Sequence, residues 1–427
     1  AVGVLVGARW LVVPLLGAGT VILTYLLGAR LFGAARATFG ACLLAISPHF
    51  VGTAATELSQ PGAAFFLLLG TWALLRSLDT ARLGWAALSG LAAGFGLAIR
   101  PLPAGLFLVV MVAYAFLAWH GARTPWPTRL KVLAFALPGV VLGGAIILLQ
   151  NHAMTGSPFS TGYEAAHGAL GETFREGDIS NSFGAALIRE NFWLFGWVCS
   201  LVFVPFARPS RAALLFWGLI AAEYSYRILV PKTVVATTGP VYVFEVVPFL
   251  ALATADGAAR LADWCGSHGF AQPRAKVAAL MLAASAFGAV TFAPVVLRAM
   301  ATSSALRARV PDALAELGAD RALVFANDLV AAGRLATWAY APPNPSPDFS
   351  DAVIYARLPE IPGGTRLAHR YWRARFPDRR AFVFVDTATA PALRELDPET
   401  APAPGLTVPE FLDGLSPTPP SSPGSQR

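Results

Sequence analysis

Candidate site residues are found where long apolar stretches of the sequence end. Glu57 and Gln60 follow one such stretch, and Arg100 with Pro101 follows another. The planar guanidinium of arginine donates paired hydrogen bonds that suit phosphate or pyrophosphate oxygens. Arg100 is therefore a candidate phosphate ligand. The alternative is an arginine that only anchors its helix at a membrane interface.

A denser polar segment, NHAMTGSPFSTGY, covers residues 151–163. Its glycines and proline favour turns, while Asn151 and Tyr163 can each donate and accept hydrogen bonds. One interpretation is part of a binding cavity. The other, which the local pattern alone favours, is a helix end followed by a structural turn, with Tyr163 in an interfacial aromatic belt.

A third cluster begins at Lys232 and continues as TTGPVYVFE over residues 237–245. Glu245 falls a turn inside an otherwise apolar stretch, close to Tyr242, where a carboxylate is costly unless it is paired or faces a wet cavity. Two interpretations of Glu245 stay open. It is either a functional carboxylate, or one that reaches the interface or pairs with Arg227 or Lys232.

The composition requires a membrane-embedded scaffold to position these residues. Of the 427 residues, 56% are hydrophobic and only 13% are charged, and the mean hydropathy is +0.57. Soluble domains carry about 25% charged residues, so an ordinary soluble protein is excluded. The net charge of +7 comes from short basic clusters between apolar stretches, a pattern that indicates membrane topology and no nucleic-acid partner.

Several other chemistries lack their motifs. The sequence has no Walker loop, no dinucleotide fingerprint and no HExxH or GxSxG motif. It therefore lacks the motifs that identify ATPases, dinucleotide-binding enzymes and proteases of these types. The three cysteines show no CxxC spacing, and neither a disulfide framework nor a cysteine metal site is predicted. His49 has no second ligand at a metal-binding spacing and is interpreted as a structural histidine.

About ten apolar stretches approach the length that a membrane-spanning helix needs. They cover residues 10–27, 38–53, 61–75, 83–99, 102–119, 130–149, 192–206, 212–230, 241–259 and 277–296. Lys and Arg concentrate in alternate connections, which the positive-inside rule assigns to the cytoplasm. Ala1 and the chain after Val296 are therefore predicted to face outward.

The predicted fold class is an all-α polytopic membrane protein with a small C-terminal α/β domain outside the cytoplasm. Residues 1–297 form the multi-span domain, with an outward loop at 151–191, and residues 298–413 form the α/β domain. A Ser- and Pro-rich tail at 414–427 is predicted to be disordered. Within the α/β domain we expect strands at 322–326, 352–355 and 381–385, helices at 311–317 and 365–375, and a loop at 342–347.

Short motifs occur in a recognisable order along almost the whole chain. They are Leu31-Phe32-Gly33, Ser47-Pro48, Ile99-Arg100-Pro101, Asn151, Thr155-Gly156-Ser157-Pro158, Gly162-Tyr163, Gly239-Pro240, Tyr242, Glu245, Pro248, Asn344-Pro345, Val353-Ile354-Tyr355-Ala356-Arg357 and Phe376-Pro377-Asp378-Arg379. In these motifs the chain resembles the GT-C superfamily of integral-membrane glycosyltransferases. The bacterial branch related to protein O-mannosyltransferases and aminoarabinose (ArnT-like) transferases is the most similar.

The resemblance implies an enzyme that moves a sugar from a polyprenyl-phosphate donor to an acceptor at the periplasmic face of a bacterial inner membrane. The lipid tail stays in the bilayer, and a carboxylate deprotonates the acceptor hydroxyl. Arg100 and Lys232 are then expected to bind the donor phosphate, and Glu57 to bind the sugar or a metal-bridged phosphate. The outer cavity is expected to be shaped by Asn151, Tyr163, Tyr242 and Glu245.

Two departures from the family pattern bear on these roles. Family members carry an acidic catalytic motif in the first outward loop, and this chain begins beyond that point, so we expect a piece that lacks its N-terminus and its catalytic base. Val241 replaces the arginine that commonly follows Gly-Pro, and Lys232 would be a weaker substitute. No definite cofactor is implied, and a divalent metal is left open. The expected partners are the lipid-linked sugar, membrane lipids and an acceptor that is a lipid, a glycan or a protein.

Two rival functions fit the same composition. A transporter or lipid flippase would place ionisable residues near the bilayer midplane and break its helices in related halves, whereas the polar groups here gather at the predicted outer interface. A catalytically degenerate scaffold is the other rival, because Val241 stands in place of an expected arginine.

Overall fold

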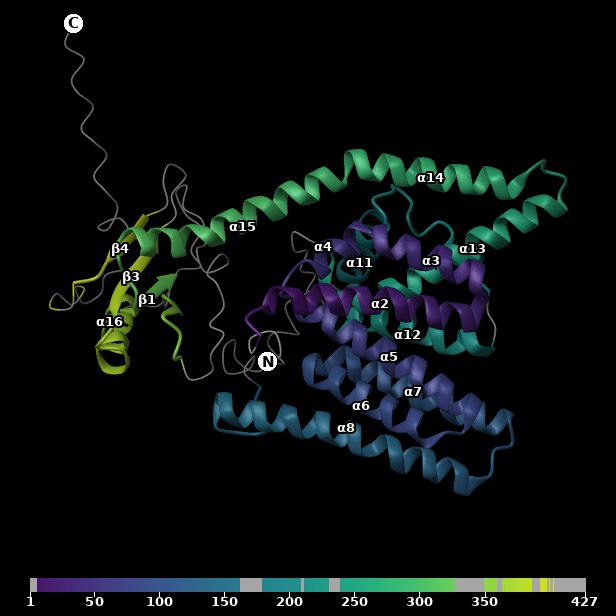
Figure 1. The fold of residues 1–427 in the computed structure, drawn as a ribbon, viewed down its shortest axis with the longest axis horizontal. Helices are drawn as coiled ribbons and strands as arrows, with labels where there is room; N and C mark the ends of the chain where they lie inside the picture. Colours follow the sequence, from purple (N-terminus) through teal and green to yellow (C-terminus); the bar gives the residue numbers. More distant parts are fainter. Residues whose placement is uncertain are drawn as a thin grey trace, which may run out of the picture. The chain divides into compact units, whose positions relative to one another are not determined.

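The computed structural model describes residues 6–161, 179–208, 211–229, 239–326, 349–358, 363–385 and 392–397, together with Glu399 and Pro402. The chain divides into two compact units, Ala1–Leu297 and Arg298–Arg427. The first unit is a bundle of helices (Figure 1). The predicted loop at 342–347 and the predicted tail at 414–427 lie outside the described residues.

The helices of the first unit follow the apolar stretches of the sequence closely. They are α2 (Arg9–Phe32), α3 (Ala34–Ile46), α4 (Pro48–Ala54), α5 (Ser59–Thr80), α6 (Leu83–Ile99), α7 (Pro101–Gly121), α8 (Trp126–Thr155), α11 (Ile179–Trp193), α12 (Arg211–Leu229), α13 (Val247–Ser267) and α14 (Pro273–Thr291). Two 3₁₀ turns, η1 (Val204–Phe206) and η2 (Val241–Val246), precede α12 and α13, and α15 (Ala293–Glu316) follows α14.

The helices make this a multi-pass membrane protein, although the predicted number of ten spans is not confirmed. Among the described residues, six helices are long and apolar enough to cross a membrane, or up to seven if α3 and α4, bent by 60° at Ser47, form one broken span. The expected span at 192–206 is wrong, because α11 ends at Trp193 and the chain then turns into η1.

The side chain of Asn191 explains why this span is not a helix. Asn191 Nδ2 donates to the carbonyl of Val198 at 2.8 Å, and its Oδ1 accepts from the amide of Leu201 at 2.9 Å. Gly196 adopts a φ of +72° inside the same turn, a conformation that favours glycine. Hydropathy alone does not register such side-chain to backbone bonds, which compete with a helix.

Helix α8 is attached to α6 through facing glycines, and the two helices lie side by side at the edge of the bundle (Figure 1). A Cβ on Gly90 of α6 would lie 1.9 Å from the carbonyl oxygen of Ala136, and one on Gly143 of α8 would lie 2.1 Å from that of Gly94. The buried residues of α8 are Val132, Gly139 and Gly143. Small residues spaced four apart let membrane helices approach closely, and van der Waals packing then holds them.

The candidate span Val241–Ser267, made of η2 and α13, forms the centre of the bundle, since 94% of its most apolar part is buried. The ring of Phe249 lies 6.0 Å from that of Phe107 in α7 and 5.6 Å from that of Phe216 in α12, in edge-to-face geometry. Such aromatic pairs add about 0.5–1.5 kcal/mol each beyond their buried area. η2 directly precedes α13 in the chain, so the packing of Phe249 near the start of α13 also helps to position η2.

The second unit contains a four-stranded sheet. Its strands are β1 (Ala322–Ala326), β2 (Val353–Arg357), β3 (Arg380–Val385) and β4 (Ala392–Glu395), in the order β2-β1-β3-β4, and α16 (Gly364–Arg375) connects β2 to β3. β1 pairs in parallel with β2 and β3, whereas β4 is antiparallel to β3. The sequence predicted the first three strands and α16 within two residues at each end, but not β4.

Helices cover both faces of this sheet. Leu323 and Phe325 of β1 pack with Ala368 and Trp372 of α16, while Val324 packs on the other face in a cluster that includes Val310 and Leu314 of α15. Because both faces are covered, β1 is apolar throughout, as expected for a parallel strand in the middle of a sheet.

Candidate functional site

Arg100, Tyr242 and Glu245 lie together where the α6–α7 corner meets η2. Arg100 caps the end of α6 directly before Pro101, which begins α7. Its Nη1 donates a hydrogen bond to Oε1 of Glu245, whose side chain is completely buried. The guanidinium carbon lies 5.6 Å from the ring centroid of Tyr242, within cation–π range. Three of the predicted site residues therefore form one cluster.

The 3₁₀ geometry of η2 explains why Tyr242 and Glu245 share this arginine. Side chains three residues apart eclipse one another in a 3₁₀ turn, so residues 242 and 245 project from the same face. Glu245 is fully buried, so its side chain does not reach the interface. Pairing with Arg227 or Lys232 stays a prediction, because those two side chains lie outside the described part of the structure. The ion pair of Glu245 with Arg100 was not predicted, since 145 residues separate the two.

A second buried pair lies on the other side of η2. His49 Nδ1 and Glu190 Oε1 are 3.0 Å apart, and both side chains are completely buried. The His49 ring meets the ring of Phe244 edge-on at 5.5 Å, so the pair abuts the residue next to Glu245. His49 Nε2 and Glu190 Oε2 have no hydrogen-bond partner within the described part of the chain.

Local chain features hold His49 in place. Ser47 Oγ accepts from the amide of Phe50 at 3.2 Å, which caps α4, and donates to the carbonyl of Leu194 just beyond α11. Gly239 has a φ of +122°, and a Cβ there would lie 2.8 Å from Cδ2 of His49. The glycine of the Gly-Pro motif is therefore needed for the close approach of the segment that leads into η2.

The remaining predicted site residues are placed differently. Glu57 is exposed in the connection between α4 and α5. Asn151 lies near the end of α8, where its Nδ2 donates to the carbonyl of Pro158 at 3.2 Å and so braces the following turn. Tyr163 and Lys232 lie outside the described residues.

The sequence did not single out two buried carboxylates. Glu190 lies in the predicted outward loop at 151–191, and its histidine partner lies 141 residues away. Glu223 is completely buried in α12, and a signal for it existed, because it is a lone carboxylate in an apolar stretch. Tyr224 beside it is also buried.

No group of three or more His, Cys, Asp or Glu residues with metal-ligand geometry is found among the residues that the structure describes. Glu57, the residue expected at a metal-bridged phosphate, is exposed on its loop. We therefore assign no residue of the described chain to a metal and base no catalytic step on one.

Comparisons with known proteins find similarity to membrane glycosyltransferases over the first third of the chain. Residues 5–142 match the profile of the family described as dolichyl-phosphate-mannose-protein mannosyltransferase. A curated relative, the putative mannosyltransferase YkcB of Bacillus subtilis (strain 168), is 31% identical over 104 residues, which cover 24% of this chain and 14% of that protein. The matched stretch is thus a small part of the relative.

One solved structure is similar in outline. The crystal structure of ArnT from Cupriavidus metallidurans in the apo state aligns with a TM-score of 0.49 and 16% identity, covering 88% of this chain and 78% of that one. The family match, which contains α2 to α7 with the Ser47-Pro48 and Arg100-Pro101 motifs, confirms the resemblance to GT-C membrane glycosyltransferases that the sequence motifs indicated.

Proposed function

We propose that this protein transfers a sugar from a polyprenyl-phosphate donor to a lipid, glycan or protein acceptor at the periplasmic side of a bacterial inner membrane. The observation that carries the proposal is the cluster of Arg100, Tyr242 and Glu245, in which an arginine is held in place at the end of a membrane helix. The match of residues 5–142 to a mannosyltransferase family supports the same reaction class.

Arg100 and Tyr242 bind the donor phosphate in this proposal, and Glu245 positions Arg100. A guanidinium has five N–H donors, so Arg100 can direct one edge to a carboxylate and another to phosphate oxygens. Lys232 supplies a second cation and Glu57 binds the sugar. Asn151 and Tyr163 shape the entrance for the acceptor.

The reaction exchanges one carbon–oxygen bond for another. The acceptor hydroxyl attacks the anomeric carbon, its proton passes to a base, and the bond between that carbon and the donor phosphate breaks, releasing polyprenyl phosphate. Negative charge grows on the leaving phosphate, and Arg100, whose side chain is only 10% exposed, stabilises it. We assign no residue as the base.

The direct test restores the sequence expected upstream of Ala1, incubates this full-length protein in liposomes with polyprenyl-phosphate sugars and measures release of polyprenyl phosphate. Arg100→Gln is expected to lower kcat/KM by about 100-fold or more, as loss of a charge-stabilising donor does. Arg82→Gln is the matched control, because Arg82 is an exposed arginine that flanks the other end of α6. Equal rates in both variants would remove the assignment of Arg100.

The rival functions have their own outcome in this assay. A well-folded full-length protein, with the segment expected upstream of Ala1 restored, that releases no polyprenyl phosphate from any donor would contradict the transferase proposal. Movement of a fluorescent lipid across the same liposomes would then favour the transporter or flippase function. Absence of both activities would favour a scaffold.

A further inference from the structure

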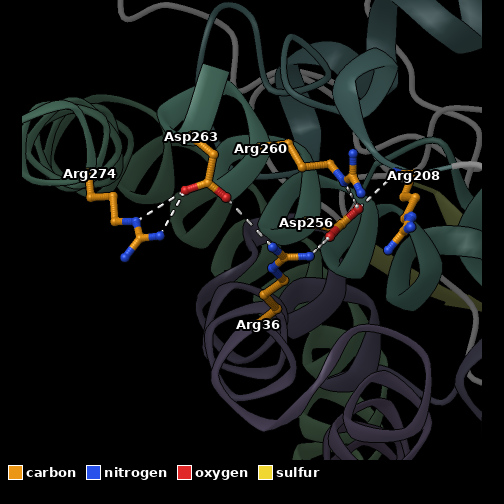
Figure 2. A network of polar contacts seen from close by, with 6 residues as sticks. All are labelled: Arg36, Arg208, Asp256, Arg260, Asp263 and Arg274. Atoms are coloured by element: carbon orange, nitrogen blue, oxygen red, sulfur yellow. Dashed lines mark hydrogen bonds and ion pairs between the residues drawn. The ribbon is translucent and has the colours of Figure 1, made fainter. Parts of the chain in front are cut away.

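A network of arginines and aspartates joins α3, α13 and the start of α14, outside the candidate site (Figure 2). At its centre is Asp256 of α13, which is completely buried. Its Oδ1 accepts from Arg36 Nη1 at 2.5 Å, its Oδ2 accepts from the amide of Arg208 at 2.8 Å, and Arg260 Nε lies 3.3 Å from Oδ2. Asp256 therefore fixes the cations around it.

The outer part of the network is open. Asp263, further along α13, lies 2.9 Å from Arg274 Nη2 and 3.9 Å from Arg36 Nη2. The side chain of Arg274 is 83% exposed. Three arginine side chains pair with the two aspartates, and Arg208, bound through its backbone amide, is the fourth arginine, so these six residues carry a formal excess of two positive charges (Figure 2).

Two hollows meet at this cluster. One is a groove of about 280 Å³ between α3, α13 and α14, with a floor of alanines including Ala258 and Ala262, and with Phe39, Ala278 and Met281 among its walls. Arg36 and Arg274 stand at its polar end. The other hollow, of about 390 Å³, shares Ala262 and Arg274 with the groove and adds Asp263 and Gln272.

The groove lies on a face that is available to lipid. Its walls Phe39 and Ala278 are exposed, while the floor residues Ala258 and Ala262 are buried. Along α14, a candidate membrane span, Leu280, Leu282 and Val290 are 61%, 70% and 76% exposed. Apolar side chains this exposed on a spanning helix contact hydrocarbon, so an acyl chain can enter the groove directly from the bilayer.

We propose that this site binds an anionic phospholipid, with one acyl chain in the groove and the phosphate on Arg36 and Arg274, which both line the groove. The excess positive charge selects an anion, and arginines between membrane helices suit lipid phosphates. The apolar groove selects a ligand that carries a hydrocarbon chain, which free phosphate lacks. A zwitterionic lipid would bring its ammonium group next to the arginines. The site is separate from the proposed donor site and does not depend on that proposal.

Native mass spectrometry of the full chain tests the site, with phosphatidylglycerol, phosphatidylcholine or inorganic phosphate added to the delipidated protein. One phosphatidylglycerol molecule is expected to stay bound in preference to phosphatidylcholine. Arg274→Gln is expected to weaken phosphatidylglycerol binding about fivefold, the effect of one basic residue near a lipid head group. Arg82→Gln, another exposed arginine at a helix end, is expected to leave binding unchanged.

The groove has its own matched pair of variants. Ala278→Trp places an indole in the groove and is expected to remove the bound lipid, whereas Ala279→Trp alters the neighbouring exposed residue, which does not line it. Both alanines are exposed, so both variants are expected to melt like the unchanged chain. Equal retention of the two lipids, equal effects of the two tryptophans, or displacement of the lipid by inorganic phosphate would each overturn the proposal.

Discussion

Arg100 and Glu245 form a buried ion pair although 145 residues separate them in the sequence. The pair joins the α6–α7 corner to η2, and it does so beside the ring of Tyr242. Removing one partner from a buried pair costs about 3–5 kcal/mol, because the other charge is left uncompensated. The pair therefore holds the α6–α7 corner against η2, and it fixes the orientation of the guanidinium before any ligand binds to Arg100.

Tyr242 tests how this guanidinium is oriented. Tyr242→Phe keeps an aromatic face beneath Arg100 and is expected to keep the KM for the polyprenyl-phosphate donor within about twofold, whereas Tyr242→Leu removes the face. A cation–π contact at a desolvated site contributes about 2 kcal/mol, so the leucine variant should raise KM roughly 30-fold. The measurement is release of polyprenyl phosphate at varied donor concentration. Equal KM values for the two variants would show that the ring is not used.

The His49–Glu190 pair makes a prediction about stability. Glu190→Leu leaves His49 Nδ1 buried without its acceptor and is expected to lower the free energy of unfolding by about 1–3 kcal/mol. The double variant His49→Phe/Glu190→Leu removes both polar groups and is expected to recover part of that loss. Unfolding of the detergent-solubilised chain provides the comparison. The single variant His49→Phe completes the comparison. If the stability losses of Glu190→Leu and His49→Phe add up to the loss of the double variant, the pair has no coupling energy.

The sequence predicted the helices well because hydropathy registers burial in lipid directly. Stretches 83–99 and 102–119 appear as α6 and α7 almost to the residue. The same signal failed at 192–206, where apolar composition persists but the side chain of Asn191 bonds the backbone and ends the helix. A short-range polar contact decided the local structure there, and hydropathy averages over such contacts.

The candidate site was predicted as a set of residues but not as a set of pairs. Glu245 was singled out because a carboxylate in an apolar stretch needs a partner, and Arg100 because it ends a helix. Their pairing depends on how η2 packs against the helices of the bundle, which no local pattern encodes. His49 was judged by ligand spacing along the chain, and its partner Glu190 lies 141 residues away. Long-range partners of this kind required the fold.

Tyr355 of β2 gives a pH-dependent prediction for the second unit. The side chain is only 8% exposed, and burial raises the pKa of its hydroxyl to about 12, from about 10 for a free tyrosine. The folded state therefore holds this proton more tightly than the unfolded state. Its contribution to stability is complete below pH 10 and is lost as the pH rises from about 10 to about 12.

The phenolate absorbance of the nine tyrosines tests this directly. The difference between the titration curves of the unchanged chain and of Tyr355→Phe isolates residue 355 and is expected to have its midpoint near pH 12. Tyr355→Phe should also flatten the fall in stability of the second unit over that range. A midpoint near pH 10 would mean that the β2 side of the sheet is open to water in solution.

Two neighbouring glycines of α8, Gly143 and Gly144, are expected to respond differently to substitution, because only Gly143 faces α6 closely. A side chain at Gly143 would meet the backbone of Gly94 at 2.1 Å, whereas one at Gly144 meets nothing within 4 Å. Gly143→Val is therefore expected to separate the two helices and lower the melting temperature, while Gly144→Val should melt like the unchanged chain. Both substitutions place the same β-branched residue in the same helix, so the difference reports packing and not helix propensity.

Cysteine crosslinking measures the separation itself. Gly90→Cys would clash, but Leu91 of α6 and Val140 of α8 lie beside the facing glycines without being buried, so a Leu91→Cys/Val140→Cys pair can report how closely the helices approach. Crosslinking by a short reagent is expected in the otherwise unchanged chain and in Gly144→Val, and is expected to be lost in Gly143→Val. Retained crosslinking and an unchanged melting temperature in Gly143→Val would mean that α8 is held by contacts other than its glycine face.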